Sequence, residues 1–590
     1  MPANSIINGQ PIWVPGVEVV SKVVSDLPGL TPNFVVPVVL GEAYEGHALG
    51  SPALQYSSET TLSPFYYSRT STGVASYYGA SSDLAAAAAY AHKVPGYPGA
   101  YYCAINTLTR TSVIVTSTGP VNQFTLYSRK FGVIAGWTKV KFASNVWTIT
   151  PPKHFALLSA NASTGSARMY FKGYKPIDWV REGMTVSVGD FTATQVENLV
   201  VSKKGSYPDS NGQLVWWVDF TTAPAAAYAT ADYAAIVEYD TKSEVSTACT
   251  TAQAAIDWLN SYSLILGAHV HADFTNAALI AVSSAVRMFE LGATWGTMTA
   301  GTSVAQTTAN WTTFSTDFQA TEHDAFIERY GAMPRLFHAL TSSSTNHATL
   351  RDMASTLRTA GKPIQVYTGC TYTDVFPTAG DDTDPTFRAA ALNSQDIYLC
   401  AGKVDRLHPY ISLAGQVFGQ KVAGGVGHNC TEDTLYKEGD VGKKWDEAVS
   451  GQLTRLHRLG VITYRLSSKS GTPRYVISQD INTLQVRTVV ANTGTNDSGY
   501  GVWRLRQDYI EFILASLTTD NSLGQDSIDR DALAAALLTR GDKILSRHLA
   551  SPLAITSITA NSSGTGWDVT CNTQQPPLSD FFSITVNAVL

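Results

Sequence analysis

The sequence has little charge, and its small net charge is negative. Charged residues make up 15% of its 590 residues and the net charge is −6, whereas about a quarter of an ordinary soluble protein is charged. A general nucleic-acid binder needs a basic stripe that displaces counterions from phosphates, so nucleic acid is not an expected partner. A polar but weakly charged surface instead predicts faces that neighbouring proteins cover.

Long apolar runs and paired cysteines are also missing. The most apolar segment, Ser263 to Ile280, is interrupted by two histidines and an aspartate, and no run reaches the ~20 apolar residues that span a bilayer. Met1 to Ile12 has no basic start followed by an apolar run, so we expect no secretory signal and no membrane insertion. No two cysteines form a CxxC pair, which favours small buried side chains in a reducing cytoplasm over zinc ligands. The six cysteines are Cys103, Cys249, Cys370, Cys400, Cys430 and Cys571.

The first half of the chain shows an α/β pattern that a β-rich block interrupts. Val17 to Val24 is strand-like and lies in an arm that prolines flank. Phe34–Leu40, Asp83–His92 and Gly99–Ile105 predict strand, helix and strand, with Ser81 or Ser82 as the helix cap. Beyond residue 107, short strand-like runs recur between Gly, Asn, Pro and Ser, which is typical of a sandwich or small barrel.

The second half returns to alternating helices and strands. Helical spacing covers Ala252–Leu259 and Thr275–Leu291, and later Val502–Leu517 and Ser527–Leu549. We therefore predict an α+β or α/β multidomain protein, with α/β core domains, an inserted all-β domain and extended N- and C-terminal strand arms. The predicted parts are an N-terminal arm (1–30), a middle α/β domain (31–106 and 245–430), an outer β-rich domain (107–244) and a C-terminal α/β domain (431–590).

One segment has the residue types of a metal site. His269-Val270-His271-Ala272-Asp273 is similar to the HxHxD loop of metallo-hydrolases, in which two imidazoles and a carboxylate bind zinc. The next residue is Phe274, where such loops usually have a further histidine. A cytoplasmic metallo-hydrolase is therefore an alternative function, but we favour imidazoles that end a strand and face solvent or a neighbour.

Three further features have ordinary structural interpretations. The run Gly424-Gly425-Val426-Gly427 lacks the GxxxxGK[ST] frame of a phosphate loop, so its glycines are interpreted as a chain turn. Aromatic pairs such as Trp216-Trp217 could stack on sugars, and a glycan-binding adhesin or baseplate component is a second alternative. An acidic loop lacks the spacing of a calcium site and is interpreted as a solvated turn: Asp374, Asp381, Asp382 and Asp384. We expect no catalytic site and no cofactor.

Several short segments occur in a characteristic order. They are Pro15-Gly16-Val17-Glu18-Val19, Val38 to Ala43 with Gly50-Ser51-Pro52, Gly99 to Tyr102, Arg335-Leu336-Phe337 with Gly361 to Ile364, and Leu459 to Ile462 with Val486 to Val489 before the helix Tyr509–Leu517. In order and spacing, these segments resemble the contractile tail sheath family of bacteriophages and related injection machines. The resemblance covers residues 10–107 and 245–590.

The resemblance implies a structural subunit with no enzymatic activity. Members of the family form hexameric rings that stack around a rigid tail tube, and contraction is a rigid-body rearrangement that drives the tube through the host envelope. The implied partners are copies of the chain itself, the tail tube protein, and baseplate and tail terminator proteins. The implied location is the virion, with assembly in the host cytoplasm. The family also places charged helical surface against the tube, which here implies Arg530, Arg540, Lys543 and Arg547.

Both chain ends predict strands that need a partner. Phe581–Leu590 alternates, with Phe582, Ile584, Val586 and Leu590 on one side, as expected of a half-buried strand. At the other end, Val17, Val19 and Val20 lie in a similar strand-like run. The family resemblance implies that such strands are donated to neighbouring subunits and complete their sheets. An ordinary C-terminal strand within the same chain is the alternative.

Overall fold

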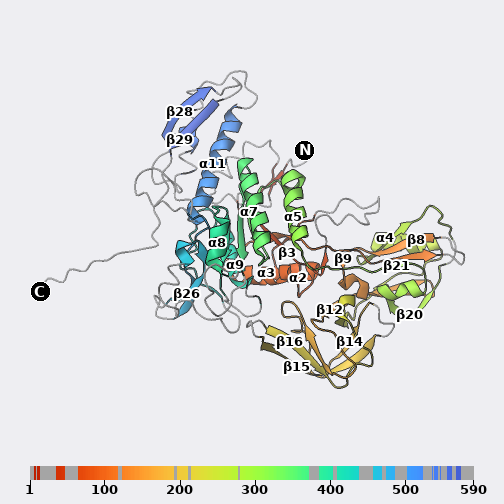
Figure 1. Ribbon diagram of the computed structural model, residues 1–590. Helices are drawn as coiled ribbons and strands as arrows, with labels where there is room; N and C mark the ends of the chain where they lie inside the picture. The colour runs from red at the N-terminus through yellow and green to blue at the C-terminus, as the bar shows by residue number, and fades with distance from the viewer. Residues whose placement is uncertain are drawn as a thin grey trace.

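The computed structural model describes nearly three quarters of the chain (Figure 1). The described residues are 5–7, 10–12, 35–46, 64–116, 122–191, 196–209, 214–276, 279–370, 384–402, 408, 410–436, 456–467, 473–485, 501–522, 534–535, 537–541, 545, 554–560 and 567–572. The protein is a mixed α/β chain with several sheets.

A seven-stranded sheet forms the centre of the molecule. Its strands, in spatial order, are β25 (Val461–Ile462), β24 (Ile397–Cys400), β23 (Gln365–Gly369), β22 (Pro334–Ala339), β3 (Val36–Gly41), β6 (Ala100–Ala104) and β5 (Tyr66–Ser68). All neighbours pair in parallel except β5, which is antiparallel to β6. Every residue of β3, β22 and β23 is buried, as expected for parallel strands that helices cover on both faces.

Helices pack on both faces of this sheet. One face is covered by α2 (Ser71–Tyr78), α3 (Asp83–Ala91), α9 (Ser412–Gly424) and α11 (Gly501–Ser522), and the other by α5 (Thr308–Asp317), the helical turn Phe318–Glu322, α6 (His323–Tyr330) and α7 (Ser344–Thr359). α8 (Pro385–Leu392) packs beside β24. Alternate residues of β3 enter the two cores, because successive strand side chains point to opposite faces: Val39 packs with α3, whereas Val38 and Leu40 pack with α5 and α7.

The helix predicted at Asp83–His92 is confirmed, with the side chain of Ser82 as its cap. Its alanines let α9 approach closely. A Cβ atom on Gly419 would lie 3.2 Å from the Cα atom of Ala91, so small residues on both helices set the distance between them.

Three further sheets lie to one side of the central sheet. A four-stranded sheet contains β18 (Glu244–Val245), β11 (Val146–Thr150), β10 (Lys139–Ala143) and β20 (Val282–Arg287). A second contains β19 (Leu266–Val270), β8 (Asn122–Ser128), β7 (Ser112–Thr116) and β21 (Met298–Thr299). A six-stranded sheet contains β12 (Pro152–Leu157), β17 (Ala235–Tyr239), β14 (Thr185–Gly189), β15 (Glu197–Pro208), β16 (Leu214–Phe220) and β13 (Arg168–Phe171). We call residues 107–304 the β-rich block; it also holds α4 (Ala252–Tyr262) and the 3-10 turns Ile134–Trp137, Thr230–Asp232 and Met288–Ala293.

Two sequence predictions in this region need correction. The helix predicted over Thr275–Leu291 is wrong: β20 and a 3-10 turn occupy most of it, because Val282 and Val286 pair with Phe142 and Val140 of β10. The β-rich block also continues past the boundary expected at residue 244, since β19, β20 and β21 complete sheets that residues 112–143 begin. The helix predicted at Ala252–Leu259 is confirmed as α4, which Thr251 caps.

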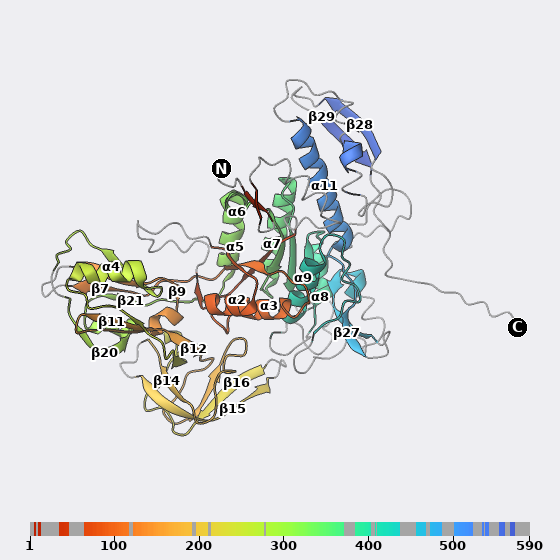
Figure 2. The same cartoon turned by 180° about the vertical axis from the view of Figure 1, so that it is seen from behind.

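The remaining elements are short strands and the C-terminal region. β1 (Ser5–Ile7) pairs with β2 (Gln10–Ile12), β4 (Glu45–Gly46) with β9 (Phe131–Gly132), and β26 (Tyr464–Ser467) with β27 (Arg474–Ile477). After α11 come a helical turn at Leu537–Gly541 and the hairpin of β28 (Ala554–Ala560) and β29 (Trp567–Asn572). Figures 1 and 2 show this hairpin beside the far end of α11, on the side of the molecule opposite the β-rich block.

Candidate functional site

Most of the predicted contact residues fall outside the described residues. These are the terminal-strand residues Val17, Val19, Val20, Phe582, Ile584, Val586 and Leu590, and the charged residues Arg530, Lys543 and Arg547. Arg540 lies in the helical turn Leu537–Gly541. Their predicted roles stay predictions.

The HxHxD-like segment does not form a cluster of converging ligand atoms. β19 ends at Val270, and the Nε2 atom of His271 lies 2.7 Å from Thr125 Oγ1, while the rings of His269 and His271 are 6.1 Å apart. Asp273 is exposed. Among the described residues, the histidine, cysteine and acidic side chains that do converge are His428, Cys430 and Asp433.

A buried cluster of charged side chains joins α11 to the central sheet. Arg504 and Asp508 lie one turn apart on α11, Arg358 lies in the last turn of α7, and Asp396 immediately precedes β24. Arg358 donates from Nε to Asp396 Oδ2 at 2.9 Å and from Nη1 to Asp508 Oδ1 at 2.7 Å. Arg504 donates from Nε to the same Asp508 oxygen at 3.0 Å. We call these four residues the α11 anchor.

The charges of the α11 anchor depend on one another because solvent hardly reaches them. The side chains of Asp396 and Asp508 are 4% and 3% exposed. Burial by itself would raise the pKa of Asp508, but Arg504 and the hydrogen bonds from Arg358 outweigh it and hold the pKa below its usual range. Burial raises the pKa of Asp396 although Arg358 opposes this. Removal of Arg358 would therefore leave the Asp396 carboxylate unpaired in the interior, whereas Asp508 would keep Arg504.

A pair of partly buried carboxyl groups lies at the carboxyl end of β3. Glu42 follows that strand, and Asp83 is the first residue of α3. The backbone N–H of Gln306 donates to Glu42 at 3.0 Å, and the hydroxyl of Tyr410 donates to Asp83 at 3.1 Å. Burial, followed by the charge of Asp83, raises the pKa of Glu42 to about 7, and burial raises that of Asp83 to about 6. Near neutral pH this pair can therefore hold a proton in the interior.

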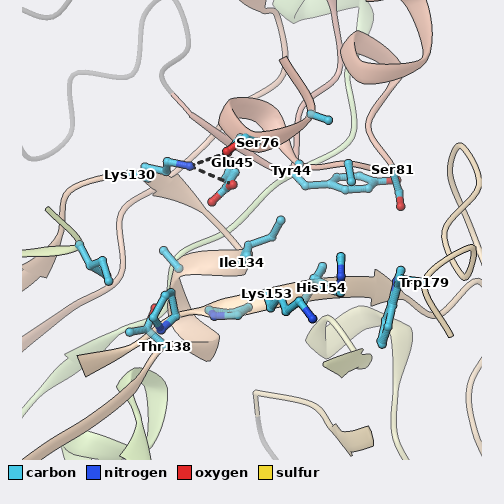
Figure 3. A pocket seen from close by; sticks show the side chains of 18 of the residues that line it. Tyr44, Glu45, Ser76, Ser81, Lys130, Ile134, Thr138, Lys153, His154 and Trp179 are labelled. Carbon is cyan, nitrogen blue, oxygen red and sulfur yellow. Dashed lines mark hydrogen bonds and ion pairs between the residues drawn. The ribbon is translucent and has the colours of Figure 1, made fainter. Parts of the chain in front are cut away.

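A cavity of about 390 Å³ lies where the central sheet meets the β-rich block (Figure 3). The sheet side contributes Tyr44 and Glu45, and the block contributes Lys130, His154 and Trp179. Lys130 bridges the two sides, because its Nζ donates to Glu45 at 3.1 Å and to the Ser76 carbonyl at 2.8 Å. The rings of His154 and Trp179 stack 5.2 Å apart. The cavity therefore lies at the interface between the β-rich block and the elements next to the central sheet.

The α11 anchor was not predicted from the sequence, although a signal was present. Arg504 and Asp508 stand four residues apart on the helical face that also carries Leu505 and Tyr509, and all four are buried. A charged i, i+4 pair on an apolar face predicts a buried partner. The identity of that partner could not be predicted, because Arg358 is 150 residues from Asp508 in the chain.

No family model and no curated protein matches the chain. It is similar to the solved structure of a sheath tail protein from Desulfitobacterium hafniense, at 10% identity and a TM-score of 0.46, over 92% of this chain and 97% of that one. A sheath tail protein from Listeria innocua is similar at 9% identity and a TM-score of 0.49, over 95% and 99% of the two chains.

A third similarity covers less of the chain. The helical sheath of the anti-feeding prophage in its contracted state is similar at 11% identity and a TM-score of 0.33, over 50% of this chain and 78% of that one. The two structures similar over more than nine tenths of this chain that are named above are both sheath tail proteins.

Proposed function

We propose that the chain is a structural subunit of a contractile tail sheath. The observation that carries the proposal is that segments with the sheath-family resemblance, although far apart in the sequence, become parts of one sheet. Val38 to Gly41 lies in β3, Gly99 to Tyr102 leads into β6, Arg335 to Phe337 lies in β22, Gly361 to Ile364 leads into β23, and Leu459 to Ile462 leads into β25. One set of short motifs therefore accounts for the centre of the molecule.

In this function the chain supplies mechanical work. Copies assemble as hexameric rings that stack around the tail tube, and they move as rigid bodies when the sheath contracts. The partners are the chain itself, the tail tube protein, and baseplate and tail terminator proteins, and the assembled protein belongs to the virion. Assembly takes place in the host cytoplasm. The metallo-hydrolase alternative has less support, since the HxHxD-like donors do not converge among the described residues.

The proposed domain roles follow from the arrangement of the elements. The β-rich block and α11 lie at opposite ends of the molecule (Figures 1 and 2). We assign the block to the outside of the sheath and residues 431–590, with the arm at residues 1–30, to the inner side near the tube. Residues 31–106 and 305–430 then form the middle domain. Arg530, Arg540, Lys543 and Arg547 remain the proposed tube-facing charges.

The α11 anchor fixes α11, the helix that precedes the C-terminal arm, to the central sheet. A donated strand at the chain end transmits force only if the segment that carries it is fixed to its own subunit. α11 precedes that end of the chain, and the anchor ties it to α7 and β24 through buried charged hydrogen bonds. Such bonds are stronger than neutral ones. Force on the arm would therefore pass into the central sheet.

Removal of residues 581–590 tests the proposal. The truncated chain should remain folded and soluble but sediment as a single subunit, whereas the full chain should sediment as large polymers. Substitutions Ile584→Asp and Val586→Asp should have the same effect, because they place charge on the apolar side of the strand. The matched controls Thr585→Ala and Asn587→Ala alter its other side and should still polymerise. Normal polymers from the truncated chain would show that the strand is not donated.

A further inference from the structure

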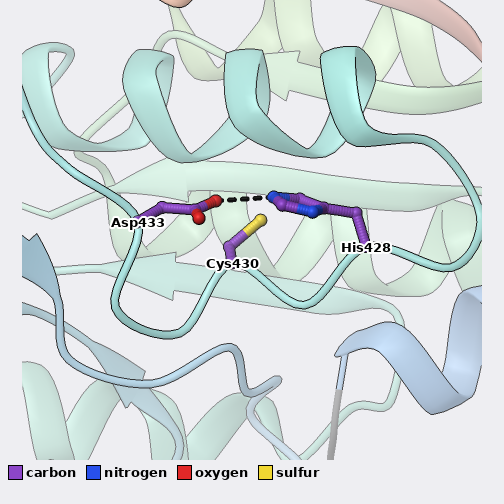
Figure 4. A group of neighbouring side chains, drawn as sticks. All are labelled: His428, Cys430 and Asp433. Atoms are coloured by element: carbon purple, nitrogen blue, oxygen red, sulfur yellow. Dashed lines mark hydrogen bonds and ion pairs between the residues drawn. The ribbon is translucent and has the colours of Figure 1, made fainter.

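Three side chains of different chemistry converge in the loop after α9. The Nε2 atom of His428 lies 2.6 Å from the Oδ2 atom of Asp433, and the ligand atoms of His428, Cys430 and Asp433 all lie within 4.8 Å of one another. In Figure 4 the sulfur of Cys430 points towards the line that joins the other two groups. Cys430 is fully buried, and no hydrogen bond from its thiol is found within the described part of the chain. The His428 and Asp433 side chains are 30% and 23% exposed.

Two glycines at the end of α9 determine where the His428 side chain lies. A Cβ atom on Gly424 would lie 2.1 Å from Cγ of His428, so the imidazole rests against the end of α9 only because residue 424 is glycine. Gly425 follows with a φ of 73°, a conformation that favours glycine. The glycine run noted in the sequence therefore positions a histidine.

The backbone that carries Asp433 is fixed by a neighbouring strand. The N–H of Ile477 in β27 donates to the Asp433 carbonyl at 2.9 Å, and the N–H of Glu432 donates back to the Ile477 carbonyl at the same distance. The N–H of Leu435 donates to the Tyr475 carbonyl, also at 2.9 Å. Residues 432–435 are thus held along β27, and the Asp433 side chain starts from a fixed backbone.

The local charge favours a cation. Lys421 is fully buried, but Asp480 compensates its charge, with 2.6 Å between Nζ and Oδ2. Glu432 is paired with Arg465. The Asp433 side chain adds a carboxylate, whose partner in the structure is the imidazole of His428. The C-terminal end of α9 adds the partial negative charge of its last carbonyl groups.

We propose that His428, Cys430 and Asp433 form a binding site for one Zn²⁺ ion. Nitrogen, sulfur and oxygen ligands together select a borderline metal such as zinc over magnesium or calcium. Zinc–ligand bonds of about 2.0–2.3 Å require the donors to be about 3.2–3.8 Å apart in a tetrahedron, so the His428–Asp433 hydrogen bond opens when metal binds. The ring proton that Nε2 of His428 donates to Asp433 moves to Nδ1 through solvent, which frees Nε2 to bind the metal. The thiol proton of Cys430 leaves to solvent, the thiolate bonds to the metal, and water takes the fourth position.

The bound metal would fix the end of α9 to residues 432–435 and so to β27. The site lies beside α11, because the Arg506 guanidinium donates to the Gly427 carbonyl at 3.2 Å. The metal would therefore stiffen the region that carries the C-terminal arm. This inference does not depend on the sheath function, since it rests on the ligand set and its backbone alone.

Cobalt substitution tests the site in the full-length, untagged chain. Metal is removed with a chelator and Co²⁺ is added, because a cobalt–thiolate bond gives a charge-transfer absorption that oxygen and nitrogen ligands do not give. We expect this absorption at one cobalt per chain, and Zn²⁺ should abolish it. Cys430→Ser should remove the absorption, and His428→Ala should weaken binding by more than about tenfold, the scale seen even for residues that only support metal ligands.

Two controls separate metal binding from folding. Cys249→Ser removes another buried cysteine, in the β-rich block, and should leave the absorption unchanged. Asp433→Asn keeps a hydrogen-bond acceptor for His428 but loses the ligand charge, so it should fold normally and bind cobalt more weakly. Absence of the charge-transfer absorption in the unmodified chain, or its persistence in Cys430→Ser, would overturn the proposal.

Discussion

At the scale of single residues, buried charge is concentrated where parts of the chain meet. Glu42 connects the end of β3 to the segment that leads into α5, through the N–H of Gln306. Arg358 connects α7, the start of β24 and α11. Because a buried charge is stable only with a partner, each such residue fixes the relative position of two elements.

Glu42 should make the stability of the protein depend on pH. Its pKa is raised from 4.5 to about 7, mainly by burial, so the folded state favours the protonated form. The stabilisation is complete below about pH 4.5 and is lost as the pH rises through about 7; a shift of this size corresponds to about 3 kcal/mol. Glu42→Gln should therefore raise the melting temperature at about pH 8 and change it little at about pH 5.

Thermal unfolding at the two pH values checks this effect. The control Glu328→Gln alters an exposed carboxyl group of α6 and should not produce a pH-dependent difference. Equal effects of Glu42→Gln at both pH values would mean that Glu42 does not hold a proton in the folded protein.

At the scale of elements, the docking of α11 depends on the α11 anchor. Arg358→Ala leaves the carboxylates of Asp396 and Asp508 buried without their shared guanidinium and should cost about 3–5 kcal/mol of unfolding free energy. Arg351→Ala, on the same helix, breaks an ion pair at 2.8 Å with Asp352, whose side chain is 68% exposed, and should cost less than about 1 kcal/mol. Urea unfolding measures both. Equal, small losses would show that the anchor does not hold α11.

Elements with a strong local pattern could be predicted from the sequence. α3 has an uninterrupted run of alanines and a serine cap, and β3 is apolar throughout, so local preference and burial agree. The Thr275–Leu291 segment misled the prediction because Val282 and Val286 fit helical spacing as well as the alternation of a strand. Pairing with β10 decided between the two, and such a contact is not visible in a local pattern.

Sites assembled from distant residues were the hardest to predict. The His428–Cys430–Asp433 group spans only six positions, yet it contains one cysteine and no spacing known for zinc. Its convergence depends on the turn that Gly424 and Gly425 permit and on the backbone pairing with β27. By contrast, the HxHxD-like segment has suggestive residue types, but its strand ends at Val270, His271 contacts Thr125 and Asp273 is exposed. Residue types alone therefore did not locate the group that converges.

At the scale of the whole molecule, two adjacent segments of the chain connect the β-rich block to the central sheet. The N–H of Val304 donates to the Thr107 carbonyl at 3.0 Å, and the N–H of Thr109 donates to the Thr302 carbonyl at 3.0 Å. The chain therefore leaves and rejoins the central sheet at nearly the same point. This arrangement is typical of an inserted domain.

Replacement of residues 107–304 by a short Gly/Ser linker tests this independence. Because the two ends are already hydrogen-bonded to each other, a linker can join them without strain, and the remaining chain should fold and still polymerise. Circular dichroism and sedimentation measure the two properties. Aggregation of the shortened chain, or loss of its cooperative unfolding, would mean that the block is part of the central core.

Electron microscopy of the purified full-length chain tests the sheath function most directly. The account predicts hollow tubes built from stacked rings of six subunits, with the β-rich block on the outer wall and residues 431–590 facing the lumen. These tubes should form without any metal or nucleotide, since the proposed contacts are made by protein strands alone. Single particles of 63.3 kDa across all salt conditions and concentrations would contradict the account.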